Sequence, residues 1–199
     1  FLSQQHNDFL EGSSVFILGE IDTHDLMEQA GELNQKNPAH ILVLRKLVET
    51  LDNRVAEVIQ YIVSLHKIPI VIGGGHNNAF GNIKGSSLAL NKKVQVINCD
   101  PHLDFRPLEG RHSGNGFSYA YSQGYLDRYS VFAMHEQYNS QATLSAFKEH
   151  PSYLYYNSYE SIFVREELDF NMALNQCIGF VKNDCCGIEL DLDAITNVP

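Results

Sequence analysis

Short apolar runs alternate along the chain with longer stretches in which apolar residues recur at helical spacing. The short runs are rich in β-branched residues and predict strands over residues 15–19, 70–73, 94–99, 130–134, 153–156 and 187–191. The longer stretches predict helices over residues 39–67, 79–90, 140–150 and 169–181. Pro38 stands just before the longest of these stretches, a position compatible with the start of a helix.

This alternation of strands and helices predicts an α/β protein. A mainly parallel sheet with helices on both faces, a three-layer αβα arrangement, is the architecture that most simply connects such elements. The 199 residues are enough for one domain with a full core, and no internal repeat is visible. We therefore expect residues 1–199 to form a single domain.

Composition narrows the class of protein. Hydrophobic residues make up 44% of the chain and charged residues 19%, which is typical of a globular protein. The formal charge of −10 argues against nucleic acid or an anionic membrane as a partner. We see no apolar run of membrane-spanning length and no signal peptide. The four cysteines lack zinc-site or disulfide spacing, so we expect free thiols and a cytoplasmic location.

Metal-ligand side chains gather where three predicted strands end. Asp100, His102 and Asp104 alternate after the strand at 94–99, so extended backbone would place them on one face. His76 follows three glycines after another strand, and Asp191 and Asp193 close the last one. The carboxyl ends of parallel strands collect ligands at one edge.

Four carboxylates and two imidazoles, with no thiolate, suit a hard ion such as Mn²⁺. They are too many for one open zinc site, and two ions that share carboxylates fit the count better. Each cluster alone has a simpler interpretation: a helix-capping histidine for His76, a solvated acidic loop after residue 99, and an exposed edge strand at the last. Against the third interpretation, we expect three apolar residues to pack behind the acids: Ile188, Leu190 and Leu192.

The three clusters resemble the signature of the ureohydrolase family, which includes arginase, agmatinase and formimidoylglutamase. The family motifs Gly-Gly-x-His, Asp-Ala-His-x-Asp and Ser-x-Asp-x-Asp occur in this order, each at a strand end, and the resemblance runs from about Val15 to the last residue. The glycine at position 75, where arginases usually have aspartate, resembles formimidoylglutamase. The chain departs from the motifs at three places: Pro101 replaces alanine, Glu189 replaces serine, and Thr196-Asn197 replace Asp-Pro.

The resemblance implies an arginase-like fold and two Mn²⁺ ions per chain. One ion would be held by His76, Asp100, Asp104 and Asp191. The other would be held by Asp100, His102, Asp191 and Asp193, which makes Asp100 and Asp191 the bridging ligands. The implied enzyme is a C–N hydrolase of linear amidines that uses a hydroxide between the ions, with Asp104 as its partner. Formimidoylglutamase activity, from formiminoglutamate to glutamate and formamide, is the specific expectation.

Candidate substrate residues lie mostly in the loop after the second motif. Arg106, Arg111 and Asn115 would suit a carboxylate-bearing substrate, although Arg106 pairing with Glu109 is an equal alternative. Phe117 stands where arginases have a histidine, which argues against an arginase-like proton shuttle.

Two further candidates are less closely tied to a motif. His112 is a candidate for proton transfer, although a surface histidine beside Arg111 is equally compatible. Glu136 or Asn139, after the strand at 130–134, is a candidate to face the substrate.

Several alternatives stay open at the level of sequence. Within the family, arginase or agmatinase activity is the alternative; outside catalysis, the chain would be an inactive binding or assembly protein. The expected partner is a small amidine or guanidine, and a homo-oligomer is compatible with the sequence. Compared with the family pattern, we expect elements to be missing after Asp193 and a substrate loop to be missing between Gly19 and Asp25.

Overall fold

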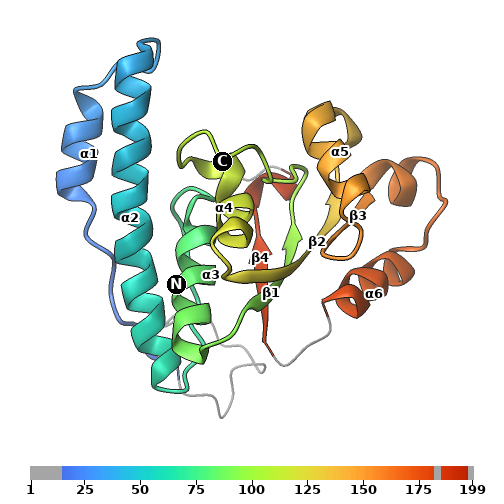
Figure 1. The fold of residues 1–199 in the computed structure, drawn as a ribbon. Coiled ribbons are helices and arrows are strands. Elements are labelled where there is room, and N and C mark those ends of the chain that lie inside the picture. Colours follow the sequence, from blue (N-terminus) through green and yellow to red (C-terminus); the bar gives the residue numbers. More distant parts are fainter. Residues whose placement is uncertain (1–14, 182–184, 197–199) are drawn as a thin grey trace.

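Four parallel strands form the centre of the protein (Figure 1). The computed structural model describes residues 15–181 and 185–196. The strands are β1 (Val94–Cys99), β2 (Leu126–Met134), β3 (Leu154–Ser158) and β4 (Cys186–Leu190), in the order β3-β2-β1-β4. Every pairing is parallel, which confirms the predicted sheet.

Helices connect the strands. They are α1 (His24–Gly31), α2 (Pro38–Ser64), α3 (Asn78–Leu90), α4 (Gly116–Ser122), α5 (Gln141–Glu149) and α6 (Phe170–Phe180). Short 3₁₀ turns occur at Ser113–Asn115, Glu136–Tyr138 and Leu192–Ala194, and a π-helical turn at Glu160–Val164. The long helix begins at Pro38, as predicted, with the Asn37 side chain accepting from the Ala39 amide.

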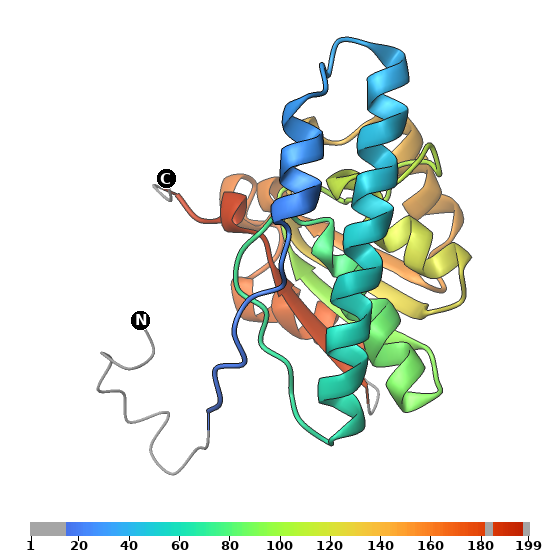
Figure 2. The same ribbon diagram turned by 90° about the vertical axis from the view of Figure 1, so that its left-hand side faces the viewer.

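The helices lie on both faces of the sheet. Helices α3, α4 and α5 cover one face, where residues such as Phe80, Val96, Tyr129 and Phe147 form the larger core. Helix α6 covers the other face through Ala173 and Cys177, which pack with Phe132 and Ile162. Outside α3 lies α2, and α1 packs on α2 (Figure 2). This arrangement confirms the three-layer αβα expectation.

Two predicted strands do not form. Residues 15–19 and 70–73 have no regular secondary structure and pair with no strand among the described residues. Their apolar side chains are exposed, as at Phe16 (76%) and Ile72 (77%). Apolar, β-branched composition alone does not make a strand, because the backbone N–H and C=O groups need a neighbouring strand as partner.

The expected packing behind the last strand is also wrong for the described residues. Ile188, Leu190 and Leu192 are 74%, 67% and 57% exposed. Strand β4 pairs only with β1 in the described sheet, and α6 contacts β2 and β3 instead.

Within the described residues, no helix combines the length and the apolar composition that crossing a membrane requires.

Close packing of α3 on α2 fixes the start of α3, immediately after His76. A Cβ at Gly85 would lie 2.5 Å from the Ala56 carbonyl oxygen and 2.8 Å from Ile59 Cβ. A Cβ at Gly81 would lie 2.6 Å from Val55 Cβ. Both glycines therefore allow the two helix backbones to approach.

We predict that Gly85→Ala destabilises the protein by about 1–3 kcal/mol, because the helices must move apart to admit the methyl group. Gly179→Ala is the matched control, since its Cβ would meet nothing within 4 Å in helix α6. The control should stabilise by about 0.5–1 kcal/mol through helix propensity. Urea unfolding measures both values, and equal effects of the two substitutions would contradict this packing argument.

Candidate metal centre

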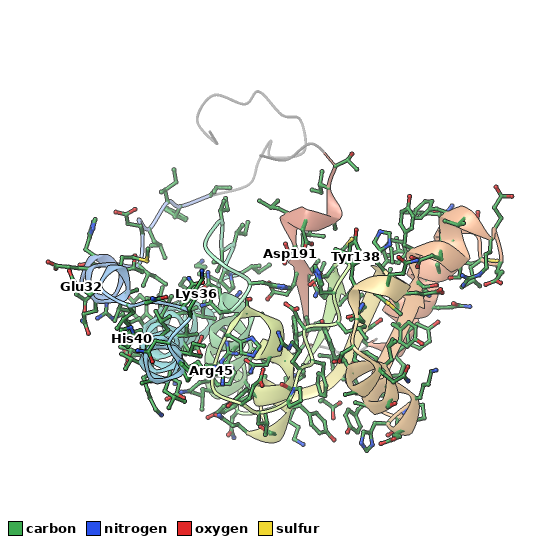
Figure 3. All side chains as sticks on the ribbon, turned by 90° about the horizontal axis from the view of Figure 1, so that it is seen from above. Glu32, Lys36, His40, Arg45, Tyr138 and Asp191 are labelled. Carbon is green, nitrogen blue, oxygen red and sulfur yellow. The ribbon has the colours of Figure 1, made fainter. Side chains whose placement is uncertain are left out.

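The site is built on the carboxyl ends of two adjacent strands. Asp100 follows β1 and Asp191 follows β4, and the parallel register pairs Cys99 with Leu190 just before them. The Asp191 amide donates to the Cys99 carbonyl at 3.1 Å, which continues the pairing to the ligands. Asp191 and Tyr138 lie at this edge in the view from above (Figure 3).

His76 reaches the same edge from the turn before α3. Gly73 and Gly74 have φ values of +89° and +78°, a conformation that glycine adopts without strain. A Cβ on Gly74 would also lie 2.7 Å from Asn78 Nδ2, which donates to the Gly73 carbonyl. The glycine-rich turn therefore brings the imidazole to the edge even though the preceding residues form no strand.

Three carboxylates surround the His76 ring and form with it one group of four ligand candidates. His76 Nδ1 lies 2.9 Å from Asp104 Oδ2, 3.0 Å from Asp191 Oδ2 and 3.2 Å from Asp100 Oδ2. These residues offer ligand atoms that all lie within 4.8 Å of one another. They are the four residues that the family resemblance implies for one ion.

A second group lies beside the first. His102 Nδ1 is 3.0 Å from Asp193 Oδ2 and 3.4 Å from Asp100 Oδ1. Asp100 belongs to both groups and faces each through a different carboxylate oxygen, as a bridging ligand would. Asp191 falls in the first group only, so its role as a second bridge stays a prediction.

Electrostatics at this edge favour a bound cation. Burial disfavours a charged His76, but the Asp100 and Asp104 carboxylates outweigh it and raise the pKa of His76 to about 10. Burial and the neighbouring carboxylates of Asp100 and Asp191 raise the pKa of Asp193 to about 6. Burial, opposed by His76, also raises the pKa of Asp104.

The buried His76 ring gives a direct test of the fit. Among the described residues, neither of its nitrogens has a hydrogen bond of normal geometry. Such orphaned groups are costly unless something satisfies them. A divalent ion among these oxygen and nitrogen donors would satisfy His76 and neutralise the acids, so the residues present fit the metal.

Two asparagines, the buried Asn98 and the half-buried Asn139, hold the ligand segments in place, and sequence reasoning missed this function of both. Asn98 Nδ2 donates to Asp100 Oδ2 at 2.9 Å and to the Tyr129 hydroxyl at 3.0 Å. Asn139 Oδ1 accepts from the Leu103 amide at 2.8 Å, and its Nδ2 donates to the Pro101 carbonyl at 3.1 Å. Asn98 stands two residues before Asp100, so strand alternation places both side chains on the same face of the sheet, and the sequence pattern alone could have indicated this.

Asp104 has a left-handed backbone with φ of +42°. This conformation is uncommon for a residue other than glycine, and it persists where the surroundings impose it. This turn places the Asp104 carboxylate 2.9 Å from His76 Nδ1. The strained residue is thus one of the ligand candidates.

The ligands open into a cleft of about 560 Å³. Its wall includes five of the six ligand candidates, all but Asp100, and, beside them, Arg106, His112, Ser113, Gly114, Tyr138, Asn139, Ser140 and Thr143. The Tyr138 ring stacks on the His102 imidazole with centroids 5.6 Å apart. Arg106 is the one arginine of this wall, and it also pairs with Glu109 at 3.2 Å. Both expectations for Arg106, a substrate contact and a partner of Glu109, are therefore compatible with the structure.

His112 is held within its own loop. Its Nδ1 accepts from the Gly114 amide at 3.1 Å, and its Nε2 lies 3.1 Å from Glu109 Oε1. Burial lowers its pKa. It lines the cleft, but Nδ1 caps the Ser113–Asn115 turn and Nε2 contacts Glu109, and proton transfer by His112 stays a prediction.

Three other predicted substrate residues are not brought to the cleft. Arg111 and Asn115 are buried, at 2% and 0% exposure, and bond each other. Their polar groups bond inside the protein, which contradicts the expectation that Arg111 and Asn115 bind substrate directly. Glu136 pairs with Arg165 at 2.7 Å and accepts from Ser158, away from the cleft lining.

Comparison with known proteins now gives the family. Residues 3–196 match the model of the Arginase family. The chain belongs to the arginase family. Formimidoylglutamase of Streptococcus pyogenes serotype M3 is 35% identical over 101 residues, which are 47% of this chain and 31% of that relative. The chain thus spans well under two thirds of the length of the relatives that it matches.

Solved structures of the arginase family share the fold. A variant of Trypanosoma cruzi formiminoglutamase, crystallised with Mn²⁺, is 25% identical with a TM-score of 0.62, covering 73% of this chain and 48% of that one. Arginase from Bacillus subtilis is 20% identical with a TM-score of 0.66, covering 92% and 62%. These likenesses confirm the arginase-like architecture expected from the motifs.

We predict that binding of the first divalent ion at about pH 8 releases about one proton, because His76 is protonated in the ion-free site and must lose that proton to bind metal. Protons therefore compete with the ion, and its affinity should rise by about tenfold per pH unit between about pH 7 and 9. Calorimetry of Mn²⁺ binding in buffers of different ionisation enthalpy measures the release. His76→Ala should abolish it; an unchanged release in this variant would contradict the assignment.

A second prediction separates the two ligand groups. Asp100→Asn should weaken both ions, since Asp100 faces both groups, whereas Asp193→Asn should weaken only one. The loss should exceed the roughly 10–100-fold that outer-shell substitutions cost. Equilibrium dialysis with Mn²⁺ gives the number of ions bound per chain. Equal losses for the two variants would show that Asp100 is not shared.

Proposed function

We propose that the protein is a binuclear manganese hydrolase of C–N bonds in linear amidines, of the formimidoylglutamase type. The observation that carries the proposal is the convergence of six ligand side chains in two groups that share Asp100. The similarity to formimidoylglutamase of Streptococcus pyogenes and to a Trypanosoma cruzi formiminoglutamase crystallised with Mn²⁺ supports it. The donor set of carboxylates and imidazoles suits Mn²⁺.

The residues would hold one ion with His76, Asp100, Asp104 and Asp191. They would hold the other with Asp100, His102 and Asp193, and Asp191 as a proposed second bridge. Two such ions supply an activated water near neutral pH and stabilise negative charge on the substrate. The chain's own contribution is to fix the ligands through Asn98 and Asn139.

Asp104 is the proposed proton carrier at the reacting carbon. Its carboxylate lines the cleft and belongs to the first ligand group, 2.9 Å from His76 Nδ1. We propose that Asp104 accepts the proton of the attacking water and passes it to the departing amine.

Arg106 is the proposed contact for a substrate carboxylate. It lies on the cleft wall with its side chain more than half exposed, and it shares Glu109 as a partner with His112. Arginine binds carboxylate through two parallel hydrogen bonds. Formiminoglutamate carries two carboxylates and agmatine none, so an arginine at this position favours formiminoglutamate.

Phe117 supports the same choice over arginase. It is fully buried, its ring stacks on Tyr129 with centroids 4.0 Å apart, and it meets the His76 ring edge-on at 5.5 Å. The residue at the position of the arginase histidine therefore packs in the core. It offers no proton to a guanidinium substrate.

The direct test is hydrolysis by the manganese-loaded chain of formiminoglutamate, arginine and agmatine. We expect formamide release from formiminoglutamate and at least about tenfold lower kcat/KM for the other two. Faster turnover of arginine would reassign the protein within the family. Two bound ions with no turnover of any of the three would favour the inactive binding protein.

Arg106→Leu should raise KM for formiminoglutamate by roughly 10–150-fold, equivalent to the about 1.5–3 kcal/mol of a charge-assisted hydrogen bond, with little change in kcat. Arg165→Leu is the control, because Arg165 is also a half-exposed, carboxylate-paired arginine but lies outside the cleft lining. Steady-state kinetics of both variants decide the point. A similar KM for Arg106→Leu and Arg165→Leu would remove Arg106 from substrate binding.

A further inference from the structure

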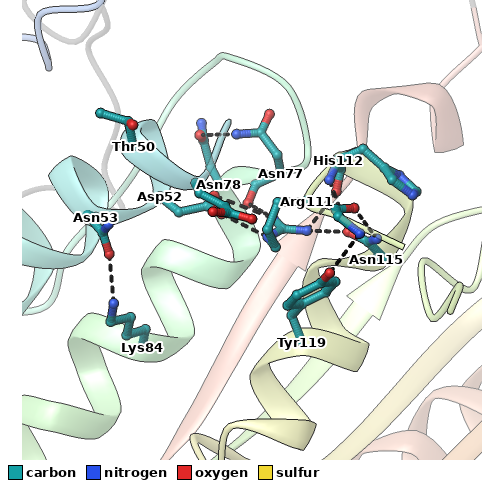
Figure 4. A network of polar contacts seen from close by, with 12 residues as sticks. Thr50, Asp52, Asn53, Asn77, Asn78, Lys84, Arg111, His112, Asn115 and Tyr119 are labelled. Carbon is teal, nitrogen blue, oxygen red and sulfur yellow. Dashed lines mark hydrogen bonds and ion pairs between the residues drawn. The ribbon is translucent and has the colours of Figure 1, made fainter. Parts of the chain in front are cut away.

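A buried cation joins the metal site to the long outer helix. Arg111 is 2% exposed, and its partner Asp52, in the middle of α2, is 1% exposed. Arg111 Nε donates to Asp52 Oδ2 at 2.7 Å, and Nη2 lies 3.4 Å from Asp52 Oδ1. Figure 4 shows the guanidinium between α2, the start of α3 and the loop of His112.

The other guanidinium hydrogens reach two further segments. Nη2 donates to the Asn77 carbonyl at 3.0 Å, and Nη1 donates to the His112 carbonyl at 2.7 Å and to Asn115 Oδ1. The guanidinium also lies over the ring of Phe80 at 5.0 Å. All five guanidinium N–H groups of Arg111 therefore have acceptors inside the protein.

Both contacted segments belong to the site. Asn77 directly follows the ligand His76, and its carbonyl also accepts from the Phe80 amide in the first turn leading into α3. His112 begins the turn whose residues Ser113 and Gly114 form a wall of the cleft. Asn115 closes that turn by accepting from the His112 amide at 3.0 Å.

We propose that Arg111, anchored by Asp52, is a positioning residue that fixes the metal ligand His76 and the cleft wall at His112–Asn115 relative to each other. The proposal rests on the proposed metal pair and deepens it by naming what aligns its first ligand. Burying a charge pair is a costly way to obtain stability alone, because its desolvation offsets much of the attraction. The rigid, planar fork of arginine instead sets directions, which suits alignment of three segments.

The first experiment measures Mn²⁺ affinity of each ion in Arg111→Lys, which keeps the charge and loses the fork. We expect the ion held by His76 to bind about 10–100-fold more weakly, as outer-shell substitutions do, and the other ion to change by less than about twofold. In a His76→Ala background only the second ion remains, and Arg111→Lys should then have no further effect.

Two companion variants separate positioning from simple loss of stability. Ile162→Ala removes packing from the core on the other face of the sheet and should destabilise the fold without changing either affinity. Asp52→Glu keeps the charge pair, so the protein should fold, but it moves the anchor by one methylene. It should weaken the first ion less than Arg111→Lys does.

Hydrogen exchange on the metal-free protein gives an independent readout. In Arg111→Lys and Asp52→Glu, the amides of Ala79, Phe80 and Asn115 should exchange faster together, while those of β1 stay protected. Equal weakening of both ions, no weakening, or the same pattern in Ile162→Ala would overturn the positioning role. Wild-type protein that binds no Mn²⁺ would overturn the proposed function, whereas coupled exchange at these amides would still show the mechanical link.

Discussion

Four carboxylates and two imidazoles converge at one edge of the sheet, and this convergence is the constraint on which the site depends. Burial, together with the neighbouring carboxylates, raises the pKa of Asp193 and of Asp104, so these acids resist ionising together when no cation offsets them. The raised pKa of His76 shows that the ring takes up a proton as the available positive charge. A pair of divalent ions would replace that proton and neutralise the acids, so fold and metal stabilise each other.

The positions of these groups follow from register and helix packing. Parallel pairing of β1 with β4 sets Asp100 beside Asp191, and Asn98 holds the Asp100 carboxylate from within the strand. His76 has no strand to place it, so its position depends on the start of α3. That start is set by the close approach of α3 to α2 and by the hydrogen bond from Arg111 to the Asn77 carbonyl.

The local patterns predicted much of the fold. The strand at residues 94–99 and the four predicted helices lie within three residues of their expected bounds, because periodicity and caps are local signals, whereas α1 and α4 were not predicted. Residues 15–19 and 70–73 were predicted as strands on composition. They pair with no described strand, and pairing is a property of segments distant in sequence.

The same distinction separates the site residues. The ligand candidates could be recognised because strand alternation and glycine-rich turns are patterns of neighbouring residues. The roles of Arg111 and Asn115 could not be recognised in this way. Arg111 was interpreted as a substrate contact because its partner Asp52 stands 59 residues earlier, inside a helix where it resembles a solvated acid. Glu136 was interpreted as a residue facing the substrate for the same reason, because its partner Arg165 lies 29 residues away in the sequence.

The most direct test of the account is anomalous scattering from crystals of the manganese-loaded protein. The account predicts two peaks about 3.5–4 Å apart, with Asp100 contacting both. One peak should lie against His76 Nδ1 and the other against His102 Nδ1. A single peak, or two that share no carboxylate, would contradict the binuclear centre.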